Sequence, residues 1–205
     1  MNSLLDEVAA YYGAKFAEYG DTPRGADWNS VESQHLRFLQ LCKIIGGDGF
    51  SINDLGCGYG ALAEYLAEHF KNVIYQGIDI SVQMIDSAKN RCRDIPNVHF
   101  SVSGKPFAKA DYTVASGIFN VRQQRSDDEW LTYIHQTLDI LNDSSTHGFS
   151  FNCLTRYSDA NKKRKDLYYA DPCALFDFCK TRYARNVALL HDYGLYEFTT
   201  LVRKS

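Results

Sequence analysis

The chain has 205 residues, of which 45% are hydrophobic, and this is enough for one domain with a sizeable core. Its net charge of −3 gives no bulk attraction to nucleic acid, and neither a basic leader nor an apolar run of about 18 residues predicts a signal peptide or a membrane span. Six scattered cysteines without a C-x-x-C pair argue against a metal site and favour reduced thiols in a cytoplasmic protein.

Two helices are predicted before the first strand. Apolar residues at helical spacing place one face of the first helix on Leu5, Val8, Tyr12, Phe16 and Tyr19. Residues 20–25, which contain two glycines and a proline, are expected to form a loop. Ser30 is a candidate cap for the second helix. The residues expected to face inward from this second helix are Val31, Phe38, Cys42 and Ile45.

A strand over residues 51–55 is predicted to end in the glycine-rich turn Asp54-Leu55-Gly56-Cys57-Gly58-Tyr59-Gly60. Glycines let the backbone approach a ligand closely, and the N-terminus of the helix that follows directs N–H groups at it. The spacing Gly56-x-Gly58-x-x-Ala61 satisfies the dinucleotide fingerprint. However, the acid Asp54 at the strand end suits a cationic ligand group better than a pyrophosphate, so both interpretations stay open here.

The second strand, residues 73–79, is predicted to end in Asp79, about 20 residues beyond the turn. A carboxylate at this position accepts hydrogen bonds from ribose hydroxyls under either interpretation. Ser81 is the expected cap of the next helix, and residues 97–102 form the third predicted strand, which Ser103 and Gly104 follow.

The second half of the chain continues to alternate strands and helices. Residues 111–115 and 148–152 are predicted strands, and the capping box Ser126-Asp127-Asp128-Glu129 opens a helix between them. Asp171-Pro172 opens the last predicted helix. Two β-rich runs, 186–191 and 196–202, are joined by the turn 192–194, which predicts an antiparallel hairpin.

The stretch 153–170 contains the basic run Lys162-Lys163-Arg164-Lys165. Such a run is either a solvated face or a site that attracts an anionic substrate or carrier. The residues alone leave both readings open.

The turn Asp54–Gly60 resembles the first motif of the class I S-adenosylmethionine-dependent methyltransferases, and the final hairpin is how that family closes its sheet. The resemblance covers nearly the whole chain. It implies a single domain over 1–205, an α/β three-layer sandwich whose seven-stranded sheet is mostly parallel with the last strand antiparallel. Residues 1–47 would form a helical lid arm, and residues 153–183 a substrate-facing insertion with the last helix.

The resemblance also implies which residues hold the cofactor. The glycine turn would pass its methionine part, with Asp54 near the amino group, Asp79 on the ribose and Met84 on the adenine. Tyr19, Trp28 and Arg37 are loosely similar to residues that glycine N-methyltransferase places over the cofactor, where the Arg pairs with the carboxylate. The alternative is that Tyr19 and Trp28 only pack and Arg37 is a solvated charge. The full set of expected cofactor contacts is Tyr19, Trp28, Arg37, Asp54, Gly56, Cys57, Gly58, Asp79, Ile80, Met84, Ser103, Gly104 and Ser116.

The implied activity is methyl transfer from S-adenosylmethionine to an oxygen or nitrogen atom of a small molecule, with S-adenosylhomocysteine as product. The loop after the fourth strand reads Ser116-Gly117-Ile118-Phe119 rather than N/D-P-P-Y, which argues against nucleobase and glutamine acceptors. Two alternatives remain: a non-catalytic S-adenosylmethionine-binding regulator or partner subunit, and an NAD-dependent oxidoreductase. The second is disfavoured by Asp54, by the helical arm and by the hairpin.

Catalytic groups are sought where parallel strands end, because ligands bind there in sheets of this kind. His191 and Tyr193 follow the sixth strand, which is expected to be parallel, and Asn120 and Asn152 leave strands four and five on the same side. His191 has a pKa suited to accepting a proton near neutral pH, and Tyr193 could orient the acceptor. The alternative is a polar turn in which His191 binds backbone.

Overall fold

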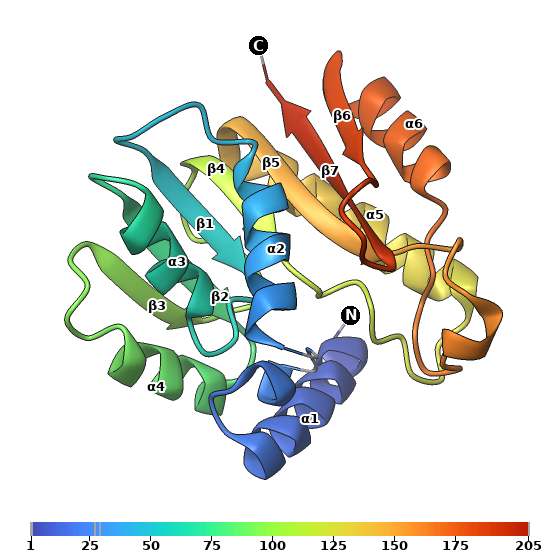
Figure 1. Cartoon of the computed structure of the whole chain (residues 1–205), viewed down its shortest axis with the longest axis horizontal. Coiled ribbons are helices and arrows are strands. Elements are labelled where there is room, and N and C mark those ends of the chain that lie inside the picture. Colours follow the sequence, from blue (N-terminus) through green and yellow to red (C-terminus); the bar gives the residue numbers. More distant parts are fainter. Residues whose placement is uncertain (1, 27, 29, 205) are drawn as a thin grey trace.

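Seven strands form one sheet in a computed structural model that describes residues 2–26, 28 and 30–204. The strand order is β3-β2-β1-β4-β5-β7-β6 (Figure 1). Strands β1 to β5 pair in parallel, whereas β7 is antiparallel to both β5 and β6, so β6 runs in the parallel direction. The strands are β1 Ser51–Leu55, β2 Ile74–Asp79, β3 Val98–Val102, β4 Ala110–Ala115, β5 Ser145–Leu154, β6 Asn186–Leu190 and β7 Glu197–Arg203. The predicted mostly parallel sheet with a reversed last strand is confirmed.

Helices cover both faces of this sheet. The helices are α1 Asn2–Tyr19, α2 Val31–Cys42, α3 Ala61–His69, α4 Val82–Arg91, α5 Asp127–Asp143 and α6 Pro172–Arg182, with short 3-10 helices at Pro23–Ala26 and Ala160–Lys162. One apolar core packs α5 and α6 on the sheet around Trp130 and Phe151, and a second packs α2 and α3 around Phe38 and Leu66. Within the described ranges, no helix combines the length and apolar character that crossing a membrane requires.

Helix starts follow the local signals in the sequence. The Ser81 hydroxyl accepts the Met84 N–H at 3.3 Å. Ser126 and Glu129 cap each other's backbone N–H groups at 3.3 and 3.0 Å, which confirms the predicted capping box. Asp171 caps α6, whose first residue is proline. These contacts involve only neighbours in the chain, which is why the sequence predicted them.

Two details differ from the prediction. The loop predicted at 20–25 contains a 3-10 helix, Pro23–Ala26, and the Trp28 N–H closes its last turn on the Pro23 carbonyl at 2.8 Å. Val31, predicted to face inward, is 49% exposed. It is the first residue of α2, and the buried face of this helix begins one turn later, at Gln34.

Candidate active site

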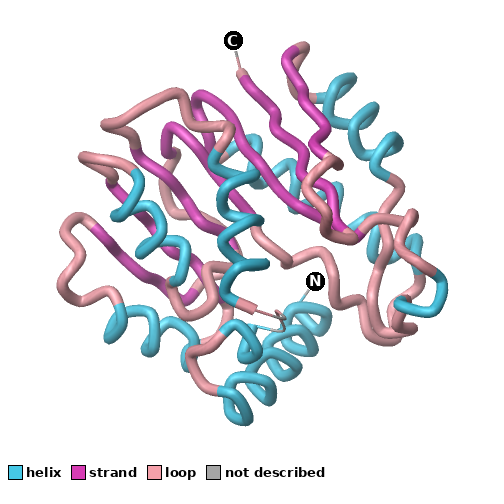
Figure 2. Tube along the Cα trace, viewed as in Figure 1, coloured by secondary structure: helices cyan, strands magenta, loops and turns pink. Residues whose placement is uncertain are grey.

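The candidate site lies at the carboxyl ends of β1 and β4. From β1 the chain goes on to β2 and β3 on one side, and β4 and β5 then fill the other side. Loops that leave adjacent strands in opposite directions open a crevice at such a switch point. Figure 2 shows these loops at the lower ends of the strands, on the side where α1 lies.

Glycine is required in the turn after β1 for two different reasons. Gly56 has a φ of +79°, and a Cβ atom there would lie 2.1 Å from the Ile118 side chain. Gly58 also has a positive φ, +54°, but a Cβ there would meet no atom within 4 Å. The Gly56 position is therefore fixed by packing, whereas Gly58 exposes backbone to open space that a ligand can enter.

Asp79 is held over this turn by backbone. Its carboxylate accepts the N–H groups of Gly58 and Ser81, each at 2.9 Å. Burial raises the pKa of Asp79, and these hydrogen bonds partly oppose that shift. A carboxylate fixed in this way keeps lone pairs for hydroxyl groups of a ligand.

Asp54 is a buried carboxyl group without a cationic partner among the residues that the structure describes. The Tyr75 hydroxyl donates to it at 2.6 Å. Burial raises the pKa of Asp54 to about 7, and the nearby Asp79 adds to the shift. A ligand with an ammonium group would compensate the charge of this carboxylate.

An apolar cavity lies on one side of the turn, between α1 and α5. Its volume is about 90 Å³, and Asp79 lies at its edge. Its other walls include Leu5, Val8, Ile80 and Tyr133. An apolar cavity next to the carboxylate of Asp79, which can accept hydrogen bonds from hydroxyl groups, suits a ligand in which an aromatic ring is attached to a sugar.

A second cavity of about 70 Å³ lies on the other side, where Asp54 and Trp28 form part of the wall. Gly56 and Ile118 line both cavities, so one elongated ligand can span the two. In the second cavity the buried Ser116 Oγ has no hydrogen-bond partner within the described chain. Orphaned polar atoms are rare in protein interiors, and this one is available to a polar ligand group.

A third, larger cavity of about 420 Å³ adjoins the second. Trp28 lines both. Its polar wall comes from α2, from the loop after β4, from the insertion after β5 and from the start of β7, in the form of Arg37, Asn120, Lys162 and Glu197. The volume lies in the range typical of small-molecule sites.

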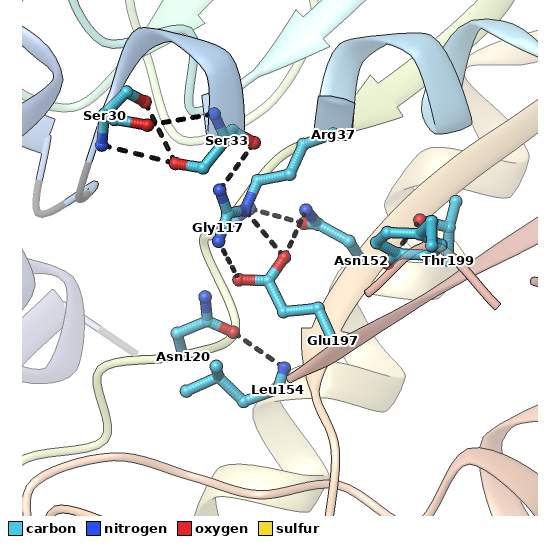
Figure 3. A network of polar contacts seen from close by, with 10 residues as sticks. Ser30, Ser33, Arg37, Gly117, Asn120, Asn152, Leu154, Glu197 and Thr199 are labelled. Atoms are coloured by element: carbon cyan, nitrogen blue, oxygen red, sulfur yellow. Dashed lines mark hydrogen bonds and ion pairs between the residues drawn. The ribbon is translucent and has the colours of Figure 1, made fainter. Parts of the chain in front are cut away.

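A buried polar network links Gly117, which lines the second cavity, to Arg37 and Glu197, which line the third (Figure 3). The Arg37 guanidinium binds both carboxylate oxygens of Glu197, each at 2.8 Å, and lies 4.1 Å from the centre of the Trp28 ring. Asn152 donates to Glu197 at 3.1 Å and accepts the Gly117 N–H at 2.7 Å. The network therefore fixes α2, the loop after β4, and strands β5 and β7 relative to one another.

The structure brings together all but one of the residues predicted to contact the cofactor. Tyr19 lies outside the three cavities, 36% exposed at the end of α1, with Lys15 5.7 Å from its ring centre. The others line the three cavities. The first cavity is lined by Gly56, Asp79, Ile80, Ser103 and Gly104. The second is lined by Trp28, Asp54, Gly56, Cys57, Gly58, Met84 and Ser116, and the third by Trp28 and Arg37. Their individual roles stay predictions.

Three of these residues lie in surroundings that differ from the expectation. Met84 lines the second cavity rather than the apolar one. The Ser103 hydroxyl donates to the Lys105 carbonyl at 2.8 Å, so its proton is used within its own turn. Arg37 is neither solvated nor free, because its Nε and Nη2 atoms donate to the two carboxylate oxygens of Glu197.

The structure does not bring His191 and Tyr193 to these cavities. Strand β7 lies between β5 and β6, so both residues follow the edge strand β6, on the far side of β7 from β5. His191 is exposed, with its ring about 6 Å from those of Tyr157 and Phe198. The Tyr193 hydroxyl bonds to that of Thr199 at 3.0 Å. Neither residue lines the three cavities, and the roles of His191 as base and of Tyr193 as acceptor-orienting group stay predictions.

Sequence reasoning missed several residues of the site. Tyr12 lines all three cavities, and the only signal was its place on the apolar face of the first helix. Ile118 had no signal, since its packing on Gly56 depends on the adjacency of β1 and β4. Glu197 had none either, because its partner lies 160 residues earlier in the chain.

The chain is similar to known proteins both in sequence and in fold. A family model described as a methyltransferase domain matches residues 52–144. The protein named "Putative methyltransferase Rv1506c" of Mycobacterium tuberculosis is 60% identical over 162 residues, which cover 79% of this chain and 98% of that protein.

Two solved structures illustrate the shared fold. The magnesium protoporphyrin IX methyltransferase of Synechocystis PCC 6803 with bound SAH matches with a TM-score of 0.68 at 14% identity, over 99% of both chains. The N-methyltransferase NodS of Bradyrhizobium japonicum WM9, in complex with S-adenosyl-l-homocysteine, matches with a TM-score of 0.67 at 16% identity, over 96% of this chain and 97% of that one. At such identities the likeness concerns the fold and leaves the acceptor open.

Proposed function

The chain belongs to the class I S-adenosylmethionine-dependent methyltransferases, and from this premise we propose that it methylates an oxygen or nitrogen atom of a small molecule bound in the third cavity. Membership of this family decides against the NAD-dependent oxidoreductase that the glycine spacing had left open. The observation that carries the proposal is the shared wall: Trp28 and Tyr12 border both the cavity beside the glycine turn and the larger polar cavity.

The cofactor would lie across the first two cavities. Asp79 would accept hydrogen bonds from its ribose hydroxyls, and the apolar slot between α1 and α5 would take the adenine. Asp54 would pair with its amino group, and the Ser116 hydroxyl would gain the partner it lacks. When bound, S-adenosylmethionine supplies a methyl group that its sulfonium makes strongly electrophilic.

The chain's own residues contribute mainly position and the exclusion of water. Trp28 is fixed between Arg37 and Gly117, where a Cβ atom would lie 2.3 Å from its ring. A wall fixed in this way holds donor and acceptor in one orientation, and orientation lowers the barrier without any proton transfer. A base is needed only for a hydroxyl or a protonated amine. Cytoplasmic location and the absence of a nucleic-acid substrate stay predictions.

The test is turnover with a panel of hydroxyl- and amine-bearing small molecules, measured as release of S-adenosylhomocysteine. The wild-type protein should convert at least one acceptor. Asp79→Ala should weaken cofactor binding by about 1–3 kcal/mol, the scale of charge-assisted hydrogen bonds, as measured by calorimetry.

The possible failures of this test have different meanings. Cofactor binding without turnover of any acceptor would favour the non-catalytic regulator or partner subunit. Unchanged affinity in Asp79→Ala would show that Asp79 does not hold the ribose. Asp79 also binds backbone of the turn, so its replacement could disturb the fold. Circular dichroism is therefore the control, and the spectrum of the variant should match that of the wild type.

A further inference from the structure

The charges that line the third cavity are paired, with one exception. Glu197 neutralises Arg37, and Asp166 neutralises Arg164 through both of its oxygens. Lys162 lines the same cavity and has no carboxylate within ion-pair distance in the described part of the chain. The cavity therefore carries one uncompensated positive charge.

Asn120 adds an oriented donor to this cavity. Its side chain is buried, with 6% of the residue exposed, and its Oδ1 accepts the Leu154 N–H at 3.2 Å. Because that N–H can only face the oxygen, the amide Nδ2 must lie on the other side, as Figure 3 shows. Within the described residues Nδ2 meets no acceptor, and Asn120 is one of the residues that line the cavity.

Several other polar groups of the cavity are already engaged within the protein. Both oxygens of Glu197 are taken by Arg37, and one of them also by Asn152. The Ser158 hydroxyl donates to the Thr155 carbonyl, and the Tyr196 hydroxyl donates to Asp159. The Lys162 ammonium and the Asn120 amide N–H are therefore two hydrogen-bond donors that the cavity offers to a ligand.

The residues of the basic run 162–165 differ in their surroundings: two of them line the cavity and two do not. Lys162 and Arg164 line the cavity. Lys163 donates to the Arg156 carbonyl and lies 5.4 Å from the centre of the Tyr169 ring, and Lys165 is exposed. Lys162 is therefore the member of the run that lines the cavity without a carboxylate partner among the described residues, and its side chain is exposed.

We propose that the methyl acceptor carries an oxyanion, a carboxylate or a phosphate, and that Lys162 and the Asn120 amide bind it in the third cavity. An oxyanion accepts hydrogen bonds and donates none, which matches the groups that the cavity offers. Tyr12, Trp28 and Tyr169 line the same cavity, and their aromatic rings suit a ring as the rest of the acceptor. This inference rests on the proposed function, because it assigns the third cavity to the acceptor.

The test uses three probes that share a phenol ring: 4-hydroxybenzoate, 4-hydroxyphenyl phosphate and the neutral 4-hydroxybenzamide. Calorimetry at low salt should show that at least one charged probe binds the protein loaded with S-adenosylhomocysteine about tenfold more tightly than the amide. The two charged probes distinguish a carboxylate acceptor from a phosphate acceptor.

Variants assign the effect to the site. Lys162→Gln should remove most of the preference for the charged probe, whereas Lys165→Gln, with the same change in charge three residues away, should retain it. Asn120→Asp keeps the oxygen that binds the Leu154 N–H and replaces the amide donor by an acceptor. This variant should therefore lower the affinity for the charged probe further. Lys162 is exposed, so its replacement leaves the core intact and tests the proposal even if Asn120→Asp does not fold.

The proposal is overturned if wild-type protein binds no charged probe, if it binds the charged and neutral probes equally, or if the two lysine variants lose the preference to the same extent. Each titration is repeated without S-adenosylhomocysteine. Failure of that product to bind would count against the proposed function, while the preference of the cavity for anions would still be measured.

Discussion

At the scale of single residues, we expect Asp54 to link cofactor binding to pH. Its pKa is raised to about 7 by burial, so the free protein holds a proton there that an unfolded chain releases near pH 4. Stability associated with this proton is present at low pH and is lost as the pH rises towards 7. A bound ammonium group favours the ionised form, so binding below pH 7 must release the proton.

We therefore expect the affinity for S-adenosylhomocysteine to rise between pH 5.5 and 7 and to level off above pH 7. Asp54→Asn should bind more weakly, with a flatter pH profile, and its ligand-free form should be more stable at pH 8 by about 1–3 kcal/mol. Calorimetry across pH and chemical denaturation measure these effects. A variant with the wild-type pH profile would show that Asp54 does not meet the cofactor.

For His191, unlike Asp54, we expect a substitution to have little effect. Because β7 separates its strand from β5, and the ring is exposed, we expect His191→Ala to keep near-normal turnover once an acceptor is known. Removal of a general base would instead lower the rate by about 10²–10⁴. A loss of that size, with S-adenosylmethionine affinity intact, would restore His191 as the base.

At the scale of elements, the Arg37–Glu197 pair joins α2 to β7. Both side chains are buried, with 8% and 1% exposed. Loss of one partner leaves the other charge buried without compensation, so Glu197→Gln should lower the free energy of unfolding by about 3–5 kcal/mol. Asp139→Asn is the matched control, because it breaks an exposed pair with Arg182 and should cost about 1 kcal/mol or less. Equal losses in denaturant titrations would contradict a special role for the buried pair.

Helix α1 is the element expected to respond to the cofactor. Its residues Leu5, Val8 and Tyr12 line the first cavity, and the first two cavities, at about 90 and 70 Å³, are smaller than the 300–1,000 Å³ typical of ligand sites. We therefore expect the helix to shift when the cofactor enters and then to pack against it. Hydrogen exchange of α1 amides should slow when S-adenosylhomocysteine is added, with α6 unchanged as the internal control. Proteolysis near residues 20–25 should slow as well; no change in either measurement would count against a closing arm.

At the scale of the whole molecule, a ligand that binds only the folded chain raises its melting temperature. At a concentration 100 times the dissociation constant, the stabilisation is about 2.7 kcal/mol, or about 5–10 °C for a domain of this size. We expect this shift with S-adenosylmethionine and S-adenosylhomocysteine and none with NAD. A shift with NAD alone would contradict the assignment of the cofactor site.

The sequence by itself determined the features that depend on neighbours in the chain. The caps at Ser81, Ser126 and Asp171, the turn through Gly56 and Gly58, and the alternation of strands and helices all follow from local backbone chemistry. The family resemblance added the mostly parallel seven-stranded sheet with its last strand reversed, but not the order of the strands.

Only the tertiary structure decided which distant side chains meet. Arg37 contacts Glu197, Asn120 and Lys162 line one cavity, and His191 follows an edge strand. Each of these arrangements depends on segments far apart in sequence. No periodicity records such pairings, since they arise from the strand order β5-β7-β6 and from loops that pack against it. The residues proposed to hold the cofactor lie mostly in turns next to strands, and the sequence named them as candidates. The polar wall of the third cavity is assembled from four separate segments, and the sequence did not show that they meet.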